Sequence, residues 1–250
     1  MNDASSRTLS RLPLIALIVV LFAGLLMMVA GFGSRWGVWH FRTGFSVLRW
    51  ATYLALLAAV ISLAAMLRAR PGSPKGGMRL SLVAFILALA FVWVPWQWQR
   101  TGRGVPPIHD ITTDTERPPQ FVRVLPLRAA TNATNPPEYG GPEVAAFQKS
   151  AYPDIAPVAL DVPPQRAFER ALDAARSMGW DVVEANLSEG RIEATDRTFW
   201  FGFRDDVVVR ILPAGGGSRI DVRSKSRVGR GDAGTNAKRV REYLARLQQG

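Results

Sequence analysis

Three uncharged apolar runs in the first hundred residues constrain the fold of this chain most. They cover residues 12–32, 50–67 and 80–99, and none contains Asp, Glu, Lys or Arg. A helix of about 20 apolar residues crosses the roughly 30 Å hydrocarbon core of a bilayer. The sequence therefore predicts that residues 1–100 form a transmembrane region with three spans at about 12–32, 50–67 and 80–99, whose partner is the lipid bilayer. Without ionisable residues in the runs, no ion or proton path is expected.

The first run must be distinguished from a secretory signal peptide, since Arg7 and Arg11 precede it. Its apolar stretch is too long for a signal peptide and two more runs follow, so we expect an uncleaved anchor. Tryptophans near the ends of the runs are typical of side chains at the membrane–water interface. They are Trp36, Trp39, Trp50, Trp93, Trp96 and Trp98.

The formal net charge of +11 is concentrated beside these runs. Residues 1–100 carry ten Lys and Arg against one acid, whereas residues 101–250 carry 21 against 19. Positive charge beside apolar spans orients them in the membrane, so this excess does not indicate a nucleic-acid partner, and none is expected.

The basic residues also bear on the orientation of the spans. A cytoplasmic N-terminus leaves six Lys and Arg on the cytoplasmic side and five on the other. Because positive charge stays inside, this small difference favours the N-terminus in the cytoplasm. Three spans then place the C-terminal domain outside it. We expect a multi-pass protein of the bacterial inner (plasma) membrane, with a periplasmic domain if the bacterium is Gram-negative.

The chain has no cysteine and two histidines, His40 and His109. This composition excludes a disulfide framework, a thiol nucleophile and a Cys/His zinc cluster. His109, Asp110 and Asp114 could be drawn as a metal site, but Asp and Thr in a proline-flanked loop more often form side-chain turns. We therefore expect neither a metal nor another cofactor.

Residues 101–157 are predicted to be a proline-rich linker, because paired prolines break any regular element there. One part of it, residues 106–127, carries apolar side chains that can lie along the surface of the following domain. They are Ile108, Ile111, Phe121, Val124 and Leu125.

Residues 158–250 are predicted to form a soluble α+β domain of order β-α-β-β-β-β-α. Its antiparallel sheet carries two helices on one face. Asp161 is the expected cap of the first helix, before the paired prolines. The predicted elements are a strand at 158–161, a helix ending at 178, strands at 180–187, 191–203, 206–213 and 218–226, and a helix at 236–249.

The third predicted strand, residues 191–203, changes its side-chain parity. Ile192 and Ala194 place the apolar face on even positions, whereas Phe199, Phe201 and Phe203 place it on odd ones. A strand with a period of two residues requires an inserted residue to do both. We therefore expect a β-bulge near residues 196–198.

The Gly/Arg loop, residues 224–236, is the candidate ligand-binding site. Its glycines permit close backbone approach, its arginines supply fixed donors, and the following helix N-terminus favours an anion. The alternative is a tight connection in which Asp232 caps the helix and the arginines pair with Asp196, Asp205 or Asp206. The candidate residues are Asp196, Arg197, Ser224, Ser226, Arg227, Gly229, Arg230, Gly231, Asp232 and Asn236.

Two long segments carry a family resemblance. IEATDRTFWFGFRDDVVVRI and GSRIDVRSKSRVGRGDAGTNAKRVREYL resemble the bacterial and plastid family known as domain of unknown function 1499, over roughly residues 109–247. IHDITTD…PPQF resembles the upstream motif of its membrane-anchored members. The family implies no established activity, cofactor or catalytic residue. The element order is also similar to helix-grip domains of outer-membrane assembly lipoproteins, which implies a binding role.

Three functional hypotheses follow. The first is a non-catalytic, envelope-facing domain that binds an anionic envelope component or a protein partner. Its surface would combine the Gly/Arg loop with an open sheet face. The second is a hydrolase in which Ser224 or Ser226 acts with Asp196 or Asp205 and His109. The third is a structural subunit of a membrane complex. The residues expected on the open face are Arg197, Arg219, Arg223 and Lys225.

Overall fold

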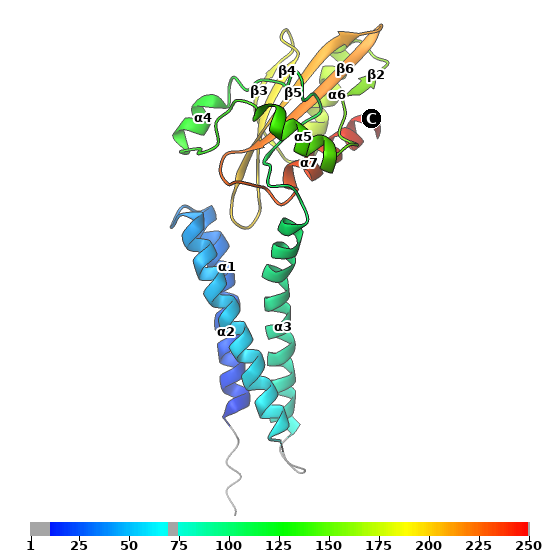
Figure 1. Cartoon of the computed structure of the whole chain (residues 1–250). Coiled ribbons are helices and arrows are strands. Elements are labelled where there is room, and N and C mark those ends of the chain that lie inside the picture. Colours follow the sequence, from blue (N-terminus) through cyan, green and yellow to red (C-terminus); the bar gives the residue numbers. More distant parts are fainter. Residues whose placement is uncertain (1–10, 70–74, 250) are drawn as a thin grey trace, which may run out of the picture. The chain divides into compact units, whose positions relative to one another are not determined.

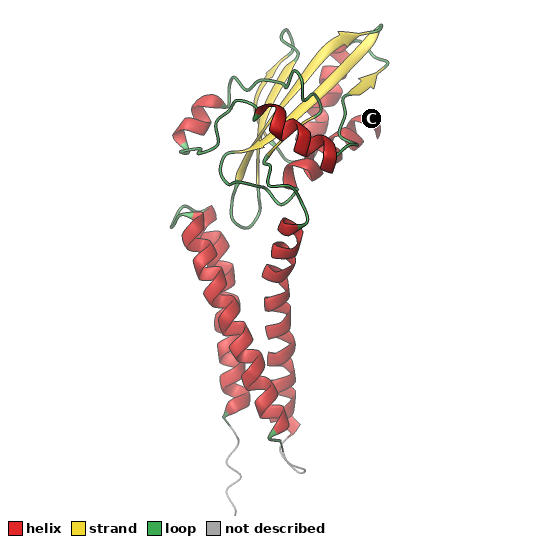
Figure 2. Cartoon of the chain, in the orientation of Figure 1, coloured by secondary structure: helices red, strands yellow, loops and turns green. Residues whose placement is uncertain are grey.

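The computed structural model describes residues 11–69 and 75–249 (Figures 1 and 2). Contacts divide the chain into two units. The first holds the residues up to Gln99 together with Trp200–Gly202, and the second holds Arg100–Phe199 and Phe203–Gly250. The fold class predicted from the sequence is confirmed, because three apolar helices precede an α+β domain built on an antiparallel sheet.

The first unit consists of α1 (Leu12–Arg35), α2 (Phe41–Leu67) and α3 (Lys75–Arg103). Each helix contains an 18-residue window with a mean hydropathy of 2.0 or more, so each is long and apolar enough to cross a membrane. The helices extend beyond the apolar runs at several ends. His40 caps α2, since its Nδ1 accepts a hydrogen bond from the Arg42 amide.

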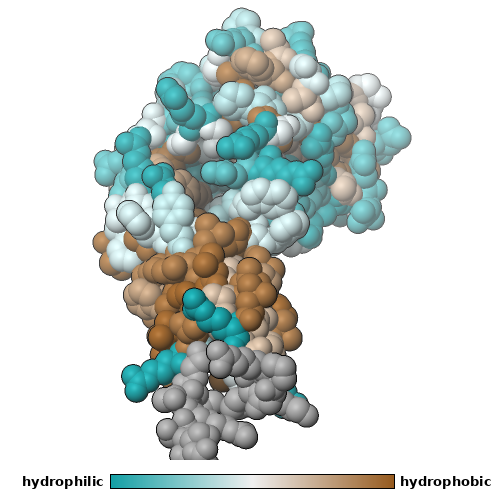
Figure 3. All heavy atoms as spheres, turned by 60° about the horizontal axis from the view of Figure 1, so that its bottom comes forward, coloured by the Kyte–Doolittle hydropathy of each residue, from teal (hydrophilic) through white to brown (hydrophobic). Residues whose placement is uncertain are grey.

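Small residues bring the three helices together. A cluster of alanines with Val20 lies where the helices meet, and glycine is required at two close approaches. A Cβ at Gly24 would lie 2.7 Å from the Phe91 ring, and one at Gly44 would lie 2.5 Å from the Ala30 carbonyl oxygen. Large apolar side chains such as Leu14, which is 55% exposed, face outward. Figure 3 shows a largely brown, apolar surface on this unit.

The second unit is built on a six-stranded antiparallel sheet of order β1-β6-β5-β4-β3, and β2 also pairs with β6. Its strands are β1 (Asp110–Thr112), β2 (Val158–Leu160), β3 (Asp181–Asn186), β4 (Arg191–Arg197), β5 (Arg204–Ala214) and β6 (Gly217–Ser226). Its helices are α4 (Leu125–Ala130), α5 (Gly141–Ala151), α6 (Pro164–Ser177) and α7 (Thr235–Gln249). From β2 onward this is the predicted order. The segment expected to be a linker contributes β1, α4 and α5.

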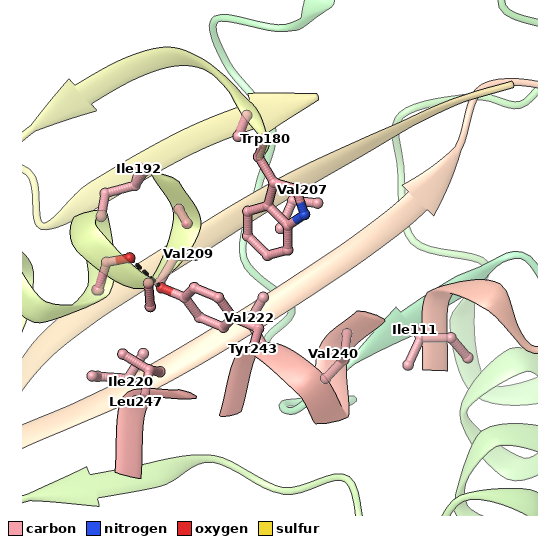
Figure 4. Packing of buried hydrophobic residues seen from close by; sticks show 14 of the residues in the cluster. Ile111, Trp180, Ile192, Val207, Val209, Ile220, Val222, Val240, Tyr243 and Leu247 are labelled. Carbon is pink, nitrogen blue, oxygen red and sulfur yellow. Dashed lines mark hydrogen bonds between the residues drawn. The ribbon is translucent and has the colours of Figure 1, made fainter. Parts of the chain in front are cut away.

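One face of the sheet packs against α6 and α7 and forms the apolar core (Figure 4). Alternate residues of the strands, such as Ile192, Val209 and Ile220, point into it. Tyr243 of α7 stacks on Trp180 at 5.0 Å and donates its hydroxyl to the Ala171 carbonyl of α6 at 2.9 Å. Complete burial raises the pKa of this tyrosine, so it stays neutral. The core thus fixes both helices on one face.

Three local predictions were wrong. Asp161 does not cap α6, because Pro163 occupies the cap position and Pro164, whose fixed φ suits the first helical residue, begins the helix. The break between the predicted strands at 204–205 and the bulge near 196–198 are also absent. β4 ends at Arg197, which pairs with Arg204 without a shift in register.

Residues 198–203 form the β4–β5 loop, closed by hydrogen bonds in both directions between Thr198 and Phe203. The change of parity therefore marks the end of the strand, and strand-forming aromatic residues in the loop concealed it. The register shift that the structure does have lies in β3, between Val182 and Glu184.

The other face of the sheet is polar, and residues 113–140 cover it. Glu193 of β4 is fully buried and accepts the backbone amides of Val122, Arg123 and Val124 at 2.8–3.1 Å. The expectation of an open face with Arg223 and Lys225 was wrong, since these side chains are 0% and 2% exposed. Buried charges require partners, which Asp110 of β1 supplies as a carboxylate and the covering segment supplies as backbone carbonyls.

Candidate functional site

The Gly/Arg loop connects β6 to α7 on a backbone that requires left-handed conformations. Gly229 and Gly234 have φ of 97° and 80°, and Ala233 adopts 53° without being glycine. Asp232 accepts the amides of Gly234 at 2.9 Å and Asn236 at 2.6 Å, and so caps α7. Burial raises the pKa of this carboxyl, although the two amide hydrogen bonds oppose the shift. The N-terminus of α7 is therefore already capped by the Asp232 carboxylate and does not present these two amides to a ligand anion.

The Arg227 side chain is buried on the polar face of the sheet and is not exposed at the surface of the loop. Its Nε and Nη2 donate to the Asp206 carboxylate at 2.9 and 2.7 Å, and its Nη1 donates to the Leu127 carbonyl at 3.1 Å. Arg128 donates to the same carboxylate at 2.6 Å, and Thr195 at 2.8 Å. Every nitrogen of the Arg227 guanidinium thus has a protein partner, so this side chain holds the covering segment to the sheet.

Ser224 and Ser226 point to the opposite face from Arg227, as the two-residue period of β6 requires. Asn236 of α7 links them, because it accepts from the Ser224 hydroxyl at 2.6 Å and donates to that of Ser226 at 2.9 Å. Arg239 lies one helical turn further on and donates to Ser224 at 3.1 Å. The candidate serines are therefore buried within a hydrogen-bonded cluster.

Arg239 is the residue that sequence reasoning missed. It donates to Asp196 and to Asp205 at 2.7 Å each, and thereby joins these strand ends to the serine cluster. Burial lowers the pKa of its guanidinium, but the two carboxylates outweigh burial and leave the pKa raised. Its position three residues after Asn236, on the same face of α7, was the available signal.

The remaining candidate residues lie nearer the surface. The Arg230 side chain is exposed, and its carbonyl oxygen lies 3.2 Å from His109 Nδ1. Gly229 and Gly231 flank it, and Asn135 Nδ2 donates to the Gly229 and Ser226 carbonyls at 3.0 Å each. Arg197 is half-buried at the end of β4. The candidate residues thus fall into a buried serine cluster, a buried arginine on the other face, and an exposed loop.

The hydrolase hypothesis requires a base beside a serine. The imidazole of His109 meets Arg230, and it is the backbone carbonyl of His109 that accepts from the Ser226 amide at 3.0 Å and from Asn236 at 3.1 Å. Within the described residues the two serine hydroxyls bond to Asn236 and Arg239. This arrangement orders the start of α7 but does not pair a nucleophile with a base.

The residues considered for a metal are engaged otherwise. Asp110 binds Arg223 through two hydrogen bonds of 2.8 Å and Lys225 through one of 2.9 Å. Asp114 forms a side-chain turn by accepting the amides of Glu116 and Arg117. No group of three His, Asp or Glu is arranged to hold a metal within residues 11–69 and 75–249.

The Asp110 cluster is buried and carries more cations than anions. Burial lowers the pKa of Lys225, and the Asp110 carboxylate opposes this shift. Tyr139 lies beside the cluster, with its ring centroid 5.6 Å from the Arg223 guanidinium carbon. Burial and the Asp110 charge raise its pKa to about 12, so the phenol stays protonated. The interior of the polar face is therefore an ordered ionic layer.

Comparison with known proteins identifies the family of this chain. The sequence model of DUF1499, a family of proteins of unknown function, matches residues 110–247. The chain belongs to the DUF1499 family. The matched region begins at the first residue of β1 and ends within α7, so it includes the segment that covers the polar face. The resemblance inferred from the sequence is thereby confirmed.

Other comparisons add little to the DUF1499 assignment. A search of the curated proteins gave no match. The crystal structure of TTHA0849 from Thermus thermophilus shares 14% sequence identity, with a TM-score of 0.25, and the alignment covers 38% of this chain and 92% of that one. A likeness of this size carries no argument about fold or function.

Proposed function

We propose that this DUF1499 protein is a multi-pass protein of the bacterial inner membrane that presents a non-catalytic binding domain outside the cytoplasm. Its ligand is an anionic component of the envelope. Three apolar helices support membrane attachment, and the slight excess of basic residues beside the N-terminus supports the orientation. The family assignment itself carries no activity.

The binding proposal rests on the unpaired backbone amides of the Gly/Arg loop. Within the described residues, the backbone amides of Gly229, Arg230 and Gly231 have no hydrogen-bond partner in the protein, and the Arg230 side chain is exposed beside them. Asn135 and the Asp232 cap hold the loop from both sides. Three free amides next to one guanidinium on a restrained loop suit a phosphate or carboxylate group.

Thermal unfolding of the full chain in detergent tests this proposal. The probes are glycerol 3-phosphate, a muropeptide and ATP. A ligand at about 100 times its Kd stabilises the folded state by about 2.7 kcal/mol, which raises Tm by several degrees. We expect such a rise with at least one probe, and we expect Arg230→Ala to abolish it.

Arg176→Ala is the matched control, because Arg176 is an exposed arginine beside Ser177, which contacts Arg246 near the C-terminal end of α7, whereas the loop precedes the N-terminal end of that helix. Arg227→Ala is unsuitable, since it leaves the buried Asp206 carboxylate without its main partner. The same rise in Arg230→Ala as in the wild type would contradict the assignment to the loop. No rise with any probe would contradict an anionic ligand and direct attention to a protein partner.

A further inference from the structure

A small cavity lies at the end of the polar face opposite to the Gly/Arg loop. Its volume is about 150 Å³. The residues that line it, called here the arginine pocket, are Asp114, Arg117, Arg210, Leu212, Pro213 and Arg219. Arg219 on β6 and Arg227, the residue that follows β6, are eight residues apart, a separation of about 26 Å at roughly 3.3 Å per residue. The arginine pocket is therefore a separate site, and the inference does not rest on the loop.

The pocket is built by the β5–β6 hairpin and by the turn that Asp114 forms. Leu212 and Arg219 face each other across the hairpin, as do Arg210 and Asp221 two residues further in. The buried Asp221 carboxylate accepts from Arg210 at 2.8 Å and from Arg219 at 3.0 Å. Asp114 accepts from both arginines at 3.0 Å. Two carboxylates thus fix the two strand arginines.

The decisive feature is the set of arginine N–H donors that these two carboxylates do not bind. Arg210 uses all of its nitrogens, because its Nη1 also donates to the Arg117 carbonyl at 2.8 Å. Arg219 binds through Nε and Nη2, and its Nη1 has no partner in the described protein. The Arg117 guanidinium has none there either, although it lines the same cavity. The guanidinium of the exposed Arg117 and the Nη1 edge of Arg219 are therefore available to a ligand at the pocket.

The balance of charge favours an anion. Three guanidinium groups stand against the carboxylates of Asp114 and Asp221, which leaves one net positive charge. If these salt bridges served only to hold the Asp114 turn against the β5–β6 hairpin, Arg210 and Arg219 would be sufficient, and Arg117 would not be needed. Leu212 and Pro213 form the apolar part of the lining, and both are also exposed to solvent.

We propose that the arginine pocket binds a small oxyanion, either a phosphate or a carboxylate group. The guanidinium fork matches two oxygens of such a group. The pocket volume of about 150 Å³ leaves room for such a group, and a larger ligand would extend into the solvent beside the exposed Arg117 and Leu212.

Isothermal titration calorimetry on the full chain in detergent tests the proposal, with inorganic phosphate as the first probe and acetate as the second. We expect saturable binding of at least one probe in about the millimolar range. Arg117→Gln removes the unpartnered guanidinium and Arg219→Gln removes the second donor edge. Each is expected to weaken binding about tenfold, the effect of losing one charge-assisted hydrogen bond.

Arg176→Gln is the control and is expected to bind like the wild type, because Arg176 is an exposed arginine that lines neither proposed site. Arg117 makes no side-chain hydrogen bond in the described structure, so its replacement leaves the fold intact, and circular dichroism checks this. No saturable binding up to about 10 mM would overturn the proposal. Unchanged affinity in Arg117→Gln and Arg219→Gln, or an equal loss in Arg176→Gln, would overturn it as well.

Two further titrations separate the sources of a phosphate group. Glycerol 3-phosphate represents a free phosphomonoester, and mixed micelles with phosphatidylglycerol, compared with phosphatidylcholine, represent a lipid headgroup. Loss of binding in Arg117→Gln with Arg230→Ala unaffected assigns the bound phosphate to the arginine pocket, and the loop site is then tested separately by thermal unfolding. The reverse pattern supports the loop site and contradicts the arginine pocket.

Discussion

At the scale of the residue, the polar face shows how carboxylates organise the DUF1499 domain. Asp114 holds two amides of its own turn and two arginines from β5 and β6. Burial raises the pKa of its carboxyl, but the amides of Arg117 and Glu116 and the charges of Arg219 and Arg210 outweigh burial and lower it below 3.8. The ionised form is therefore the one that the fold stabilises.

This lowered pKa predicts a pH-dependent loss of stability. The carboxylate contributes above its unfolded pKa of 3.8, and the contribution disappears as pH falls through the lower folded pKa. Asp114→Asn keeps the shape but removes the charge, and we expect it to destabilise the domain by about 1 kcal/mol near pH 6, since its arginine partners are partly solvated. Urea unfolding followed by near-UV circular dichroism measures the difference.

The difference between Asp114→Asn and the wild type should be smaller at pH 3 than at pH 6, because the carboxyl is then largely protonated in the unfolded state, and it disappears completely only below the lowered folded pKa. Asp173→Asn is the control, since Asp173 is 77% exposed on α6 and is expected to change stability little at either pH. A difference as large at pH 3 as at pH 6 would show that the charge of Asp114 is not what stabilises the turn.

The positions of single candidate residues were partly predictable from the sequence. The two-residue period of β6 separates Ser224 and Ser226 from Arg227, and the sequence alone contains that information. The pairing of Arg227 with Asp206 was among the alternatives read from the sequence. Arg239 was missed because its carboxylate partners come from two different strand ends, and only the folded sheet brings these together.

At the scale of the element, the covering segment explains why a proline-rich stretch is part of the domain. Residues 113–140 have little regular structure, so their backbone groups need partners elsewhere. Glu193 supplies three of them by accepting the amides of residues 122–124. Phe121, Val124 and Val208 add an apolar contact beside this clamp. One buried carboxylate on β4 thus fixes the covering segment.

We predict that Glu193→Gln loosens this segment. The amide side chain is neutral and offers one acceptor to three donors, so the cost is about 2–3 kcal/mol. Hydrogen exchange measured by mass spectrometry should show faster exchange at residues 122–124. Glu189→Gln is the control, because Glu189 is 51% exposed at the β3–β4 turn. Unchanged exchange at 122–124 would contradict the clamp.

Elements with a clear period were predictable, and those without one were not. The three apolar runs and the order from β2 to α7 follow from hydrophobic patterns of 3.6 and 2 residues. The β4–β5 loop was misread because Phe199, Trp200 and Phe201 have strand-forming side chains. β1 is three residues long and is defined by its pairing with β6, which local sequence cannot specify.

At the scale of the whole molecule, the chain consists of three apolar helices followed by a DUF1499 domain with an ionic layer inside it. The apolar surface of the helices is what a bilayer requires, and the domain has its own core. The side of the membrane on which the domain lies decides which anions it can meet. The charge difference between the two sides is a single residue, so this point needs a direct measurement.

Single-cysteine labelling makes that measurement, because the natural chain has no cysteine. Lys238→Cys places a thiol on the exposed side of α7, and Arg68→Cys places one at the end of α2. Intact cells are treated with a membrane-impermeant maleimide, and permeabilised cells serve as the control for reactivity. We expect the cysteine at 238 to react in intact cells and the one at 68 to react only after permeabilisation. The opposite pattern would place the DUF1499 domain in the cytoplasm and contradict its proposed position outside it.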